Sequence, residues 1–196
     1  MINLSLREII KNGLHGKNFY LKILRDEDIS QEYLAWLCDP DVNKFLESRF
    51  ISHTIDSLRA NLAQFDSESK FFFGLFEASQ KKHVGNFNIH FNKNHQTVYY
   101  GYLIGDKEYW GKSAALLGTY LTLKFSFDVL KARKVWGSIY LENIAAIINV
   151  KKFGFIEEGR QKNQYIINGK PTDCILVGLS REQWLLKKNK FSLLYE

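Results

Sequence analysis

The pattern of apolar and polar residues is clearest between residues 98 and 155. Val98–Ile104 is an apolar, aromatic-rich run of strand length. After a short loop, apolar side chains recur at intervals of four and three residues, namely Leu116, Tyr120, Leu123, Phe127 and Leu130. This spacing predicts a helix that begins near Gly111 and turns one apolar stripe towards a core.

The rest of the chain shows similar patterns. Residues 84–91 alternate between apolar and polar side chains, the polar ones being Asn86, Asn88 and His90, as is typical of a strand with one buried face. Further strands are expected at Phe19–Leu24, Phe71–Phe76, Lys134–Leu141, Phe155–Ile167 and Thr172–Leu179, the last two joined by a turn at Asn168-Gly169. Further helices are expected at Asp26–Leu37, Thr54–Phe65, Ala145–Phe153 and Ser180–Lys188. Mostly antiparallel strands followed by a strand-helix-strand unit predict a mixed sheet with helices on its faces.

The start of the long helix is a candidate anion site. Its first turn, Gly111 to Ala115, reads Gly-Lys-Ser-Ala-Ala and carries no bulky side chain that would keep a ligand away. The unpaired backbone amides of a first helical turn point along the positive end of the helix dipole. We therefore predict a phosphate-binding site here, with Lys112 in contact with the phosphate.

A nucleoside triphosphate P-loop is the first family of site to consider. That loop places four residues between its first glycine and Gly-Lys-Ser/Thr. Here five residues separate Gly105 from Gly111, they are bulky and charged, and no second strand ends in a metal-holding aspartate. The loop length therefore argues against a P-loop.

A second family fits the order of several short motifs. Trp110 to Ala115 aligns with the signature Gln/Arg-x-x-Gly-x-Gly/Ala, although Trp110 replaces the Gln/Arg and Ser113 replaces the central glycine. Gly101-Tyr102 precedes this stretch, and Glu142-Asn143 and the Lys-Lys-Phe-Gly-Phe run at 151–155 follow it. This series resembles the ribosomal-protein N-acetyltransferase branch of the GNAT superfamily of acyl-CoA-dependent N-acyltransferases.

The resemblance implies a fold and a co-substrate. The fold would be GNAT-like α/β (α+β), one domain over residues 1–196, with a mixed, mostly antiparallel seven-stranded sheet, helices on both faces and splayed central strands. The co-substrate would be acetyl-CoA, with its pantetheine arm along Tyr102 to Ile104, the Leu103 region donating to the thioester oxygen, and its pyrophosphate on the amides of Gly111 to Ala115. The implied coenzyme-binding residues are Tyr102, Leu103, Ile104, Trp110, Gly111, Lys112, Ser113, Ala114, Ala115 and Asn143.

Direct acyl transfer to an amine needs a positioned thioester, a polarised carbonyl and a path for two protons. Where several superfamily members carry a glutamate base this chain has Tyr99, and where others carry a tyrosine acid it has Val150. Glu142 and Tyr140 are the predicted catalytic residues, because the expected strand places both on one face near its C-terminal end. His90 and a water molecule remain alternatives.

The resemblance leaves the acceptor open. The preferred prediction is acetyl transfer to a protein N-terminal amine, as in modification of ribosomal proteins. The alternative acceptor is a nucleotide-linked amino sugar of surface glycan biosynthesis, and an interpretation of another class is a catalytically silent CoA-binding sensor or scaffold. The helices at 26–37 and 54–65 would form a lid over the acceptor and carry its specificity.

Composition changes this picture little. The 196 residues, 45% of them hydrophobic and 24% charged, carry a net charge of +6 that is scattered along the chain. The chain has no recognised nucleic-acid-binding motif, so this charge alone does not indicate binding to nucleic acid. The chain shows no membrane-spanning run and no signal-peptide core, and its two cysteines, Cys38 and Cys174, have no metal-ligand spacing. We therefore expect a cytoplasmic monomer or homodimer with reduced thiols and no metal site.

Overall fold

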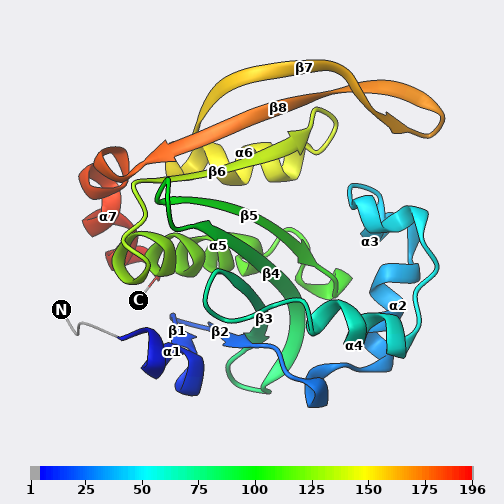
Figure 1. Cartoon of the computed structure of the whole chain (residues 1–196), viewed down its shortest axis with the longest axis horizontal. Helices are drawn as coiled ribbons and strands as arrows, with labels where there is room; N and C mark the ends of the chain where they lie inside the picture. The colour runs from blue at the N-terminus through cyan, green and yellow to red at the C-terminus, as the bar shows by residue number, and fades with distance from the viewer. Residues whose placement is uncertain (1–4, 196) are drawn as a thin grey trace.

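The structure, a computed structural model, describes residues 5–195. Within that range the strands form one eight-stranded sheet in the order β1-β2-β3-β4-β5-β6-β8-β7 (Figure 1). Neighbouring strands are antiparallel except β5 and β6, which are parallel. The strands are β1 Leu14–His15, β2 Phe19–Ile23, β3 Lys70–Glu77, β4 Lys82–Asn92, β5 Thr97–Ile104, β6 Lys134–Tyr140, β7 Ile156–Ile167 and β8 Lys170–Ser180.

The predicted mixed, mostly antiparallel sheet is confirmed, with eight strands in place of seven. The additional strand, β1, has two residues that pair with β2, too few for an alternating pattern to reveal it. The predicted hairpin between β7 and β8 is also confirmed. Asn168 and Gly169 both have positive φ values, 50° and 74°, as a two-residue hairpin turn requires.

Several helices begin at residues that cap them. Ser30, Thr54 and Asn143 each accept a hydrogen bond from a first-turn amide of the helix that follows. The helices are α1 Leu6–Asn12, α2 Gln31–Cys38, α3 Pro40–Asn43, α4 Ile55–Leu62, α5 Ala114–Lys124, α6 Ile144–Phe153 and α7 Arg181–Tyr195. Short 3-10 turns lie at η1 Asp26–Asp28, η2 Glu47–Phe50 and η3 Lys107–Tyr109, and a π-helical turn at η4 Phe125–Val129 continues α5.

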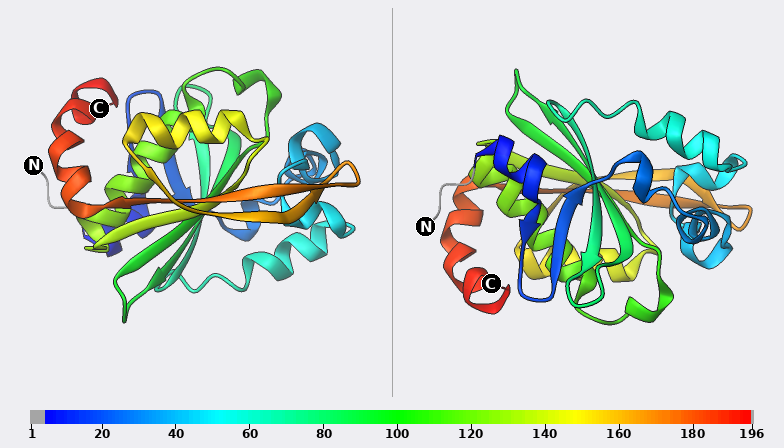
Figure 2. Two further views of the ribbon diagram at one scale, coloured as in Figure 1. Left: turned by 90° about the horizontal axis from the view of Figure 1, so that it is seen from above. Right: turned by 90° about the horizontal axis from the view of Figure 1, so that it is seen from below.

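Helices cover both faces of the sheet, as predicted. Figure 2 shows α5 and α6 on one side of the strands and α4 on the other. The larger core lies on the α5 side, and a smaller one lies between the sheet and α2 and α4. We call residues 31–62, from α2 through η2 to α4, the lid.

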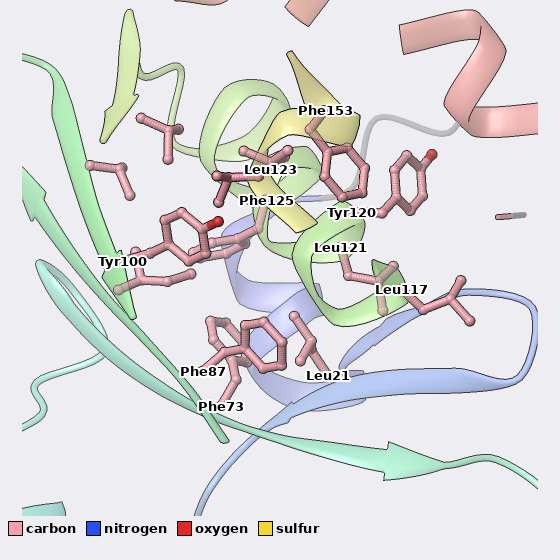
Figure 3. Packing of buried hydrophobic residues seen from close by; sticks show 14 of the residues in the cluster. Leu21, Phe73, Phe87, Tyr100, Leu117, Tyr120, Leu121, Leu123, Phe125 and Phe153 are labelled. Carbon is pink, nitrogen blue, oxygen red and sulfur yellow. The ribbon is translucent and has the colours of Figure 1, made fainter. Parts of the chain in front are cut away.

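Helix α5 runs through the larger core and is buried almost all round. Figure 3 shows Tyr120, Leu121 and Leu123 of α5 among side chains of the sheet and Phe153 of α6. Of the predicted stripe Tyr120, Leu123 and Phe127 are buried, but Leu116 and Leu130 are only half-buried. The single-stripe expectation was therefore too narrow, because neighbours lie on both sides of the helix. A Cβ on Gly118 would lie 2.2 Å from the Phe87 ring, so glycine allows α5 to approach β4 this closely.

The polar face of β4 does not face solvent. Asn86 is 4% exposed, and Asn88 and His90 are half-buried, because the lid covers this face of the sheet. The alternating pattern correctly predicts a strand here. It does not reveal that the polar side is also enclosed.

Candidate active site

Strands β5 and β6 part after a short stretch of pairing. Their parallel register joins Thr97 to Lys134, Val98 to Val135 and Tyr99 to Trp136, and no further pairs follow. Beyond Tyr99 each strand keeps its other neighbour, β4 or β8, so the two diverge while remaining in the sheet. The splayed central strands implied by the resemblance are therefore present. We call the opening between β5 and β6 beyond Tyr99 the wedge.

On the edge of β5 that faces the wedge, the backbone groups come from Tyr102 and Ile104. In an antiparallel pair, successive residues point their backbone groups alternately towards one neighbour and the other. The Leu103 carbonyl oxygen faces β4, where it would lie 2.3 Å from a Cβ on Gly85. Tyr102 and Ile104 therefore direct their N–H and C=O groups towards the wedge. Leu103 lines the same cleft but does not provide these edge groups.

Trp110 ties the loop after β5 back to this edge. Its indole Nε1 donates to the Ile104 carbonyl oxygen at 2.8 Å, and the ring is 43% exposed at the mouth of the cleft. Trp110 stands where the family signature has glutamine or arginine. The indole of Trp110, in place of a glutamine or arginine side chain, thus holds the loop against the end of β5.

The segment just before α5 is open, although the helix itself begins at Ala114 and not near Gly111 as expected. Gly111 has φ +71°, a Cβ added to it would meet no atom within 4 Å, and Lys112 and Ser113 are exposed. The Ser113 side chain makes no capping hydrogen bond, so it does not cover the free amides. Ala114 differs from its neighbours, because the whole residue is buried, and it does not line the cleft. The segment from Gly111 to Ser113 is therefore open enough for the predicted phosphate-binding site.

Asn143 caps α6 beside the wedge. Its Oδ1 accepts from the Ala146 amide at 3.1 Å, and the residue lines the cleft together with Ala115. The cap explains why α6 begins here. It also leaves the Asn143 side-chain amino group available to a ligand in the wedge.

These parts line one continuous cleft of about 890 Å³. Its α5 end consists of residues 102–104, 110–112, 115 and 143. Its lid end lies between the lid, the polar face of β4, Tyr99, the end of β6 and Tyr165 of the β7–β8 hairpin. A long ligand in the wedge could therefore meet a second ligand that enters beneath the lid.

The lid end contains a cluster that joins distant segments. The Tyr140 hydroxyl donates to Glu47 of η2, and Arg49 Nη1 donates to the Tyr140 oxygen at 3.0 Å. Arg49 also donates to the carbonyl oxygens of Leu46 at 2.7 Å and Ile166 at 2.9 Å, so it joins the lid to the hairpin. Burial, and then the neighbouring Glu47, raise the pKa of Tyr140 to about 12. Tyr140 therefore keeps its proton at neutral pH and is a donor rather than a base.

Glu142 is not in this cluster, which corrects the expectation that it shares a face with Tyr140. Strand β6 ends at Tyr140, so the alternation that would have placed Glu142 beside it is broken. Glu142 is exposed, accepts from the Thr172 hydroxyl and does not line the cleft.

The other positions considered for proton transfer lie in different places relative to the cleft. Tyr99 lines the lid end, with its ring 4.9 Å from that of Trp136. Val150 also borders the cleft but has no polar group. His90 packs against Phe65, outside the cleft lining, and burial lowers its pKa.

Sequence reasoning missed Glu47 and Arg49. Both lie in an irregular segment between two predicted helices, where no periodicity marks them. For Asn86 and Asn88 a signal was available, because their alternation with apolar residues puts them on one face. What it could not show was that this face borders the cleft.

Three further features concern the part of the chain that the structure describes. Within residues 5–195 no group of three or more histidine, cysteine, aspartate or glutamate side chains is placed to hold a metal ion. No helix in the part of the chain that the structure describes is long and apolar enough to cross a membrane. Cys38 and Cys174 are both free thiols.

Comparisons with known proteins agree with the family that the motifs and the diverging strands indicate. The family model described as Acetyltransferase (GNAT) domain matches residues 18–156. The probable N-acetyltransferase YjcK of Bacillus subtilis is 24% identical over 166 residues, covering 80% of this chain and 90% of YjcK. The [ribosomal protein uS5]-alanine N-acetyltransferase of Escherichia coli is 25% identical over 118 residues, covering 59% of this chain and 60% of that enzyme.

A solved structure shows the same fold. Spermidine N-acetyltransferase from Vibrio cholerae, in complex with CoA and spermine, superposes with a TM-score of 0.76 at 21% identity and covers 86% of this chain and 98% of its own. The fold, the acetyl-CoA co-substrate and the enzyme class expected from the motifs are confirmed. The chain belongs to the GNAT family of acetyl-CoA-dependent N-acetyltransferases.

Proposed function

We propose that the protein transfers the acetyl group of acetyl-CoA directly to the N-terminal amine of a peptide or protein. The observation that carries this proposal is the scarcity of charge at the lid end of the cleft. Its lining is mostly aromatic, aliphatic and neutral polar, with Asp41 and Glu47 as its acidic members and His53 as its one histidine. Such a surface suits one amine on an otherwise uncharged chain.

Both carboxylates already have partners, although the Glu47 side chain remains exposed to the cleft. Asp41 pairs with Lys107 at 2.9 Å, and Glu47 accepts from Tyr140 and lies 4.0 Å from Arg49. A polyamine carries several charges that would each need a carboxylate partner when taken out of water. The lid end provides a place for one of them at most.

The α5 end would hold the coenzyme. The N–H and C=O groups of Tyr102 and the N–H of Ile104 face the wedge and can pair with the amides of a pantetheine arm, while the first-turn amides of α5 can bind a diphosphate. Lys112 and Asn143 flank these groups. The bound coenzyme supplies an activated thioester, and the backbone donors along β5 would polarise its carbonyl.

Glu47 would bind the incoming amine and take its proton. It lies on the lid, its side chain is 64% exposed, and it faces the cleft. Tyr140 and Arg49 would position it, since the Tyr140 hydroxyl donates to its carboxylate and Arg49 Nη1 lies 4.0 Å from it. This assignment replaces Glu142 in the role of proton acceptor.

A polyamine is the second candidate acceptor. It is favoured by the likeness in fold to the Vibrio cholerae spermidine enzyme and by Asp39, Asp41 and Glu47 on the lid. Against it, Lys107 neutralises Asp39 at 2.7 Å as well as Asp41.

A panel of acceptors separates these possibilities. The purified protein is given acetyl-CoA with an alanine-initiated peptide amide, spermidine or a nucleotide-linked amino sugar, and both free thiol and product mass are followed. We expect the highest kcat/KM for the peptide, with one acetyl group on its α-amine. A higher value for spermidine or the amino sugar would contradict the proposal. Coenzyme binding without turnover of any amine would instead indicate a sensor or scaffold.

A further inference from the structure

Two asparagines of β4 have side-chain atoms that lack partners beneath the lid. Among the described residues, Asn86 Nδ2 and Asn88 Oδ1 are buried and make no hydrogen bond. Both residues line the cleft. Buried polar atoms without a partner are uncommon in folded proteins, and a pair of them in a cleft points to a ligand.

His83 fixes which way Asn86 points. The His83 Nε2 atom lies 3.0 Å from the Gly85 carbonyl oxygen and 2.8 Å from Asn86 Oδ1. A carbonyl oxygen can only accept, so Nε2 carries the proton and donates to both oxygens. The Asn86 amino group is therefore turned away from His83 and remains a free donor.

The surroundings of His83 keep this arrangement in place. Its ring stacks on Phe76 at 4.8 Å and meets the edges of Trp36 at 5.0 Å and Tyr33 at 5.9 Å. Burial lowers the pKa of His83 and so favours the neutral ring, and the two oxygen partners of Nε2 place the proton on that atom. His83 is thus a positioning residue for Asn86.

Asn88 presents the complementary atom. It pairs across the sheet with Gly101, and its Oδ1 would lie 2.8 Å from a Cβ at that position. Any larger residue at 101 would crowd this oxygen. The glycine therefore leaves room for Asn88 to present an acceptor next to the donor of Asn86, two residues away on the same face of β4.

We propose that Asn86 and Asn88 bind the first peptide group of the acceptor. Asn86 Nδ2 donates to its carbonyl oxygen, and Asn88 Oδ1 accepts from a main-chain N–H. This inference rests on the proposed function and adds to it the chemical group that is recognised. Both residues line the cleft beneath the lid, so the acceptor would reach them by inserting between β4 and the lid.

The pair distinguishes acceptor classes. A protonated polyamine has only donors, so it would leave the Asn86 amino group without a partner. A peptide has a carbonyl and an N–H beside its terminal amine. It therefore satisfies both asparagines at once.

The test combines a protein change with a matching change in the acceptor. Asn86→Leu removes the donor, and a peptide analogue with CH2 in place of its first carbonyl removes the matching acceptor. With the unmodified alanine-initiated peptide amide, Asn86→Leu is expected to lower kcat/KM by about 10- to 100-fold, the usual effect of leaving a buried group unpaired. The KM for acetyl-CoA should not change. The CH2 analogue should lose a similar factor with the wild-type protein and show little further loss with Asn86→Leu.

Controls separate the outcomes. Asn94→Leu, at an exposed position in the β4–β5 turn, should match the wild type. His83→Phe should reduce discrimination between peptide and CH2 analogue only when Asn86 is present, an effect that general loss of stability would not produce. If wild-type protein acetylates the peptide but Asn86→Leu retains full activity and discrimination, this inference is wrong while the proposed function stands. If wild-type protein does not acetylate the peptide, the proposed function fails and the peptide-binding role falls with it.

Discussion

The two ends of the cleft are built in different ways. The α5 end comes almost entirely from one stretch, residues 101–115, and presents backbone groups: the edge of β5 and the first turn of α5. The lid end assembles side chains from η2, β4, β6 and the β7–β8 hairpin. Its cluster spans up to 117 residues along the chain, from Arg49 to Ile166.

This contrast predicts that the two ends respond differently to substitution. A site made of backbone amides depends on local conformation and space, so Trp110 and Ser113 can replace signature residues while the turn keeps its shape. A site made of side chains depends on each residue and on the tertiary contacts that bring it there. We therefore expect point changes at the lid end to alter chemistry and acceptor choice, and changes at the α5 end to alter coenzyme affinity.

The largest effect is expected at Glu47. Glu47→Gln keeps the shape of the side chain but removes the carboxylate that would take the amine proton. We expect kcat to fall by about 10²- to 10⁴-fold, the usual contribution of general acid-base catalysis, with little change in the Kd for acetyl-CoA. Steady-state kinetics and calorimetry measure the two quantities.

Glu142→Gln is the matched control for that experiment. Glu142 bonds Thr172 outside the cleft, so its variant should turn over like the wild type. Loss of turnover in Glu142→Gln but not in Glu47→Gln would return the proton-accepting role to Glu142. It would also mean that the lid supplies specificity alone.

A smaller effect, on binding rather than chemistry, is expected at Ser113. Its side chain is exposed, so Ser113→Glu adds a carboxylate beside the free amides without disturbing the core. Repulsion of the coenzyme diphosphate should weaken acetyl-CoA binding by roughly 100-fold, equivalent to about 3 kcal/mol at a partly solvated site. Ser113→Ala should bind normally, because the backbone amide is retained. Ala114 is unsuitable for this test, since its side chain is buried and a glutamate there would damage the fold.

Most of the fold could be predicted from the sequence because its elements have strong local signals. The alternation at 84–91 and the Asn168-Gly169 turn each correspond to the observed structure. Helix α6 ends at Phe153 as predicted, followed by Gly154 with φ +90°. Elements without such signals were missed. Helix α1 is a short segment of seven residues after its Ser5 cap, and β1 has two residues.

The candidate site divides in the same way. The sequence predicted the helix start near Gly111, a few residues before Ala114 where α5 begins, because small residues at a helix start have a local physical meaning. The phosphate site there stays a prediction. Glu142 was placed wrongly because the exact end of β6 decides which way the following side chains point, and the ends of elements are poorly defined by sequence. The Glu47–Tyr140–Arg49 cluster exists only when the lid, β6 and the hairpin come together, so no short motif encodes it.

The smallest effect is expected at Tyr140, and its pH dependence tests the cluster. Tyr140→Phe removes the hydroxyl that orients Glu47, so kcat/KM for the acceptor should fall by about 10-fold. Because the pKa of Tyr140 is raised to about 12, the phenol is protonated at both pH 7 and pH 9. The ratio of variant to wild-type kcat/KM should therefore be the same at both values, and any stability that the neutral phenol contributes should be lost only as pH rises towards 12. A ratio that changes several-fold between pH 7 and pH 9 would show that Tyr140 itself exchanges a proton during the reaction, and would move the acid-base role from the lid to β6.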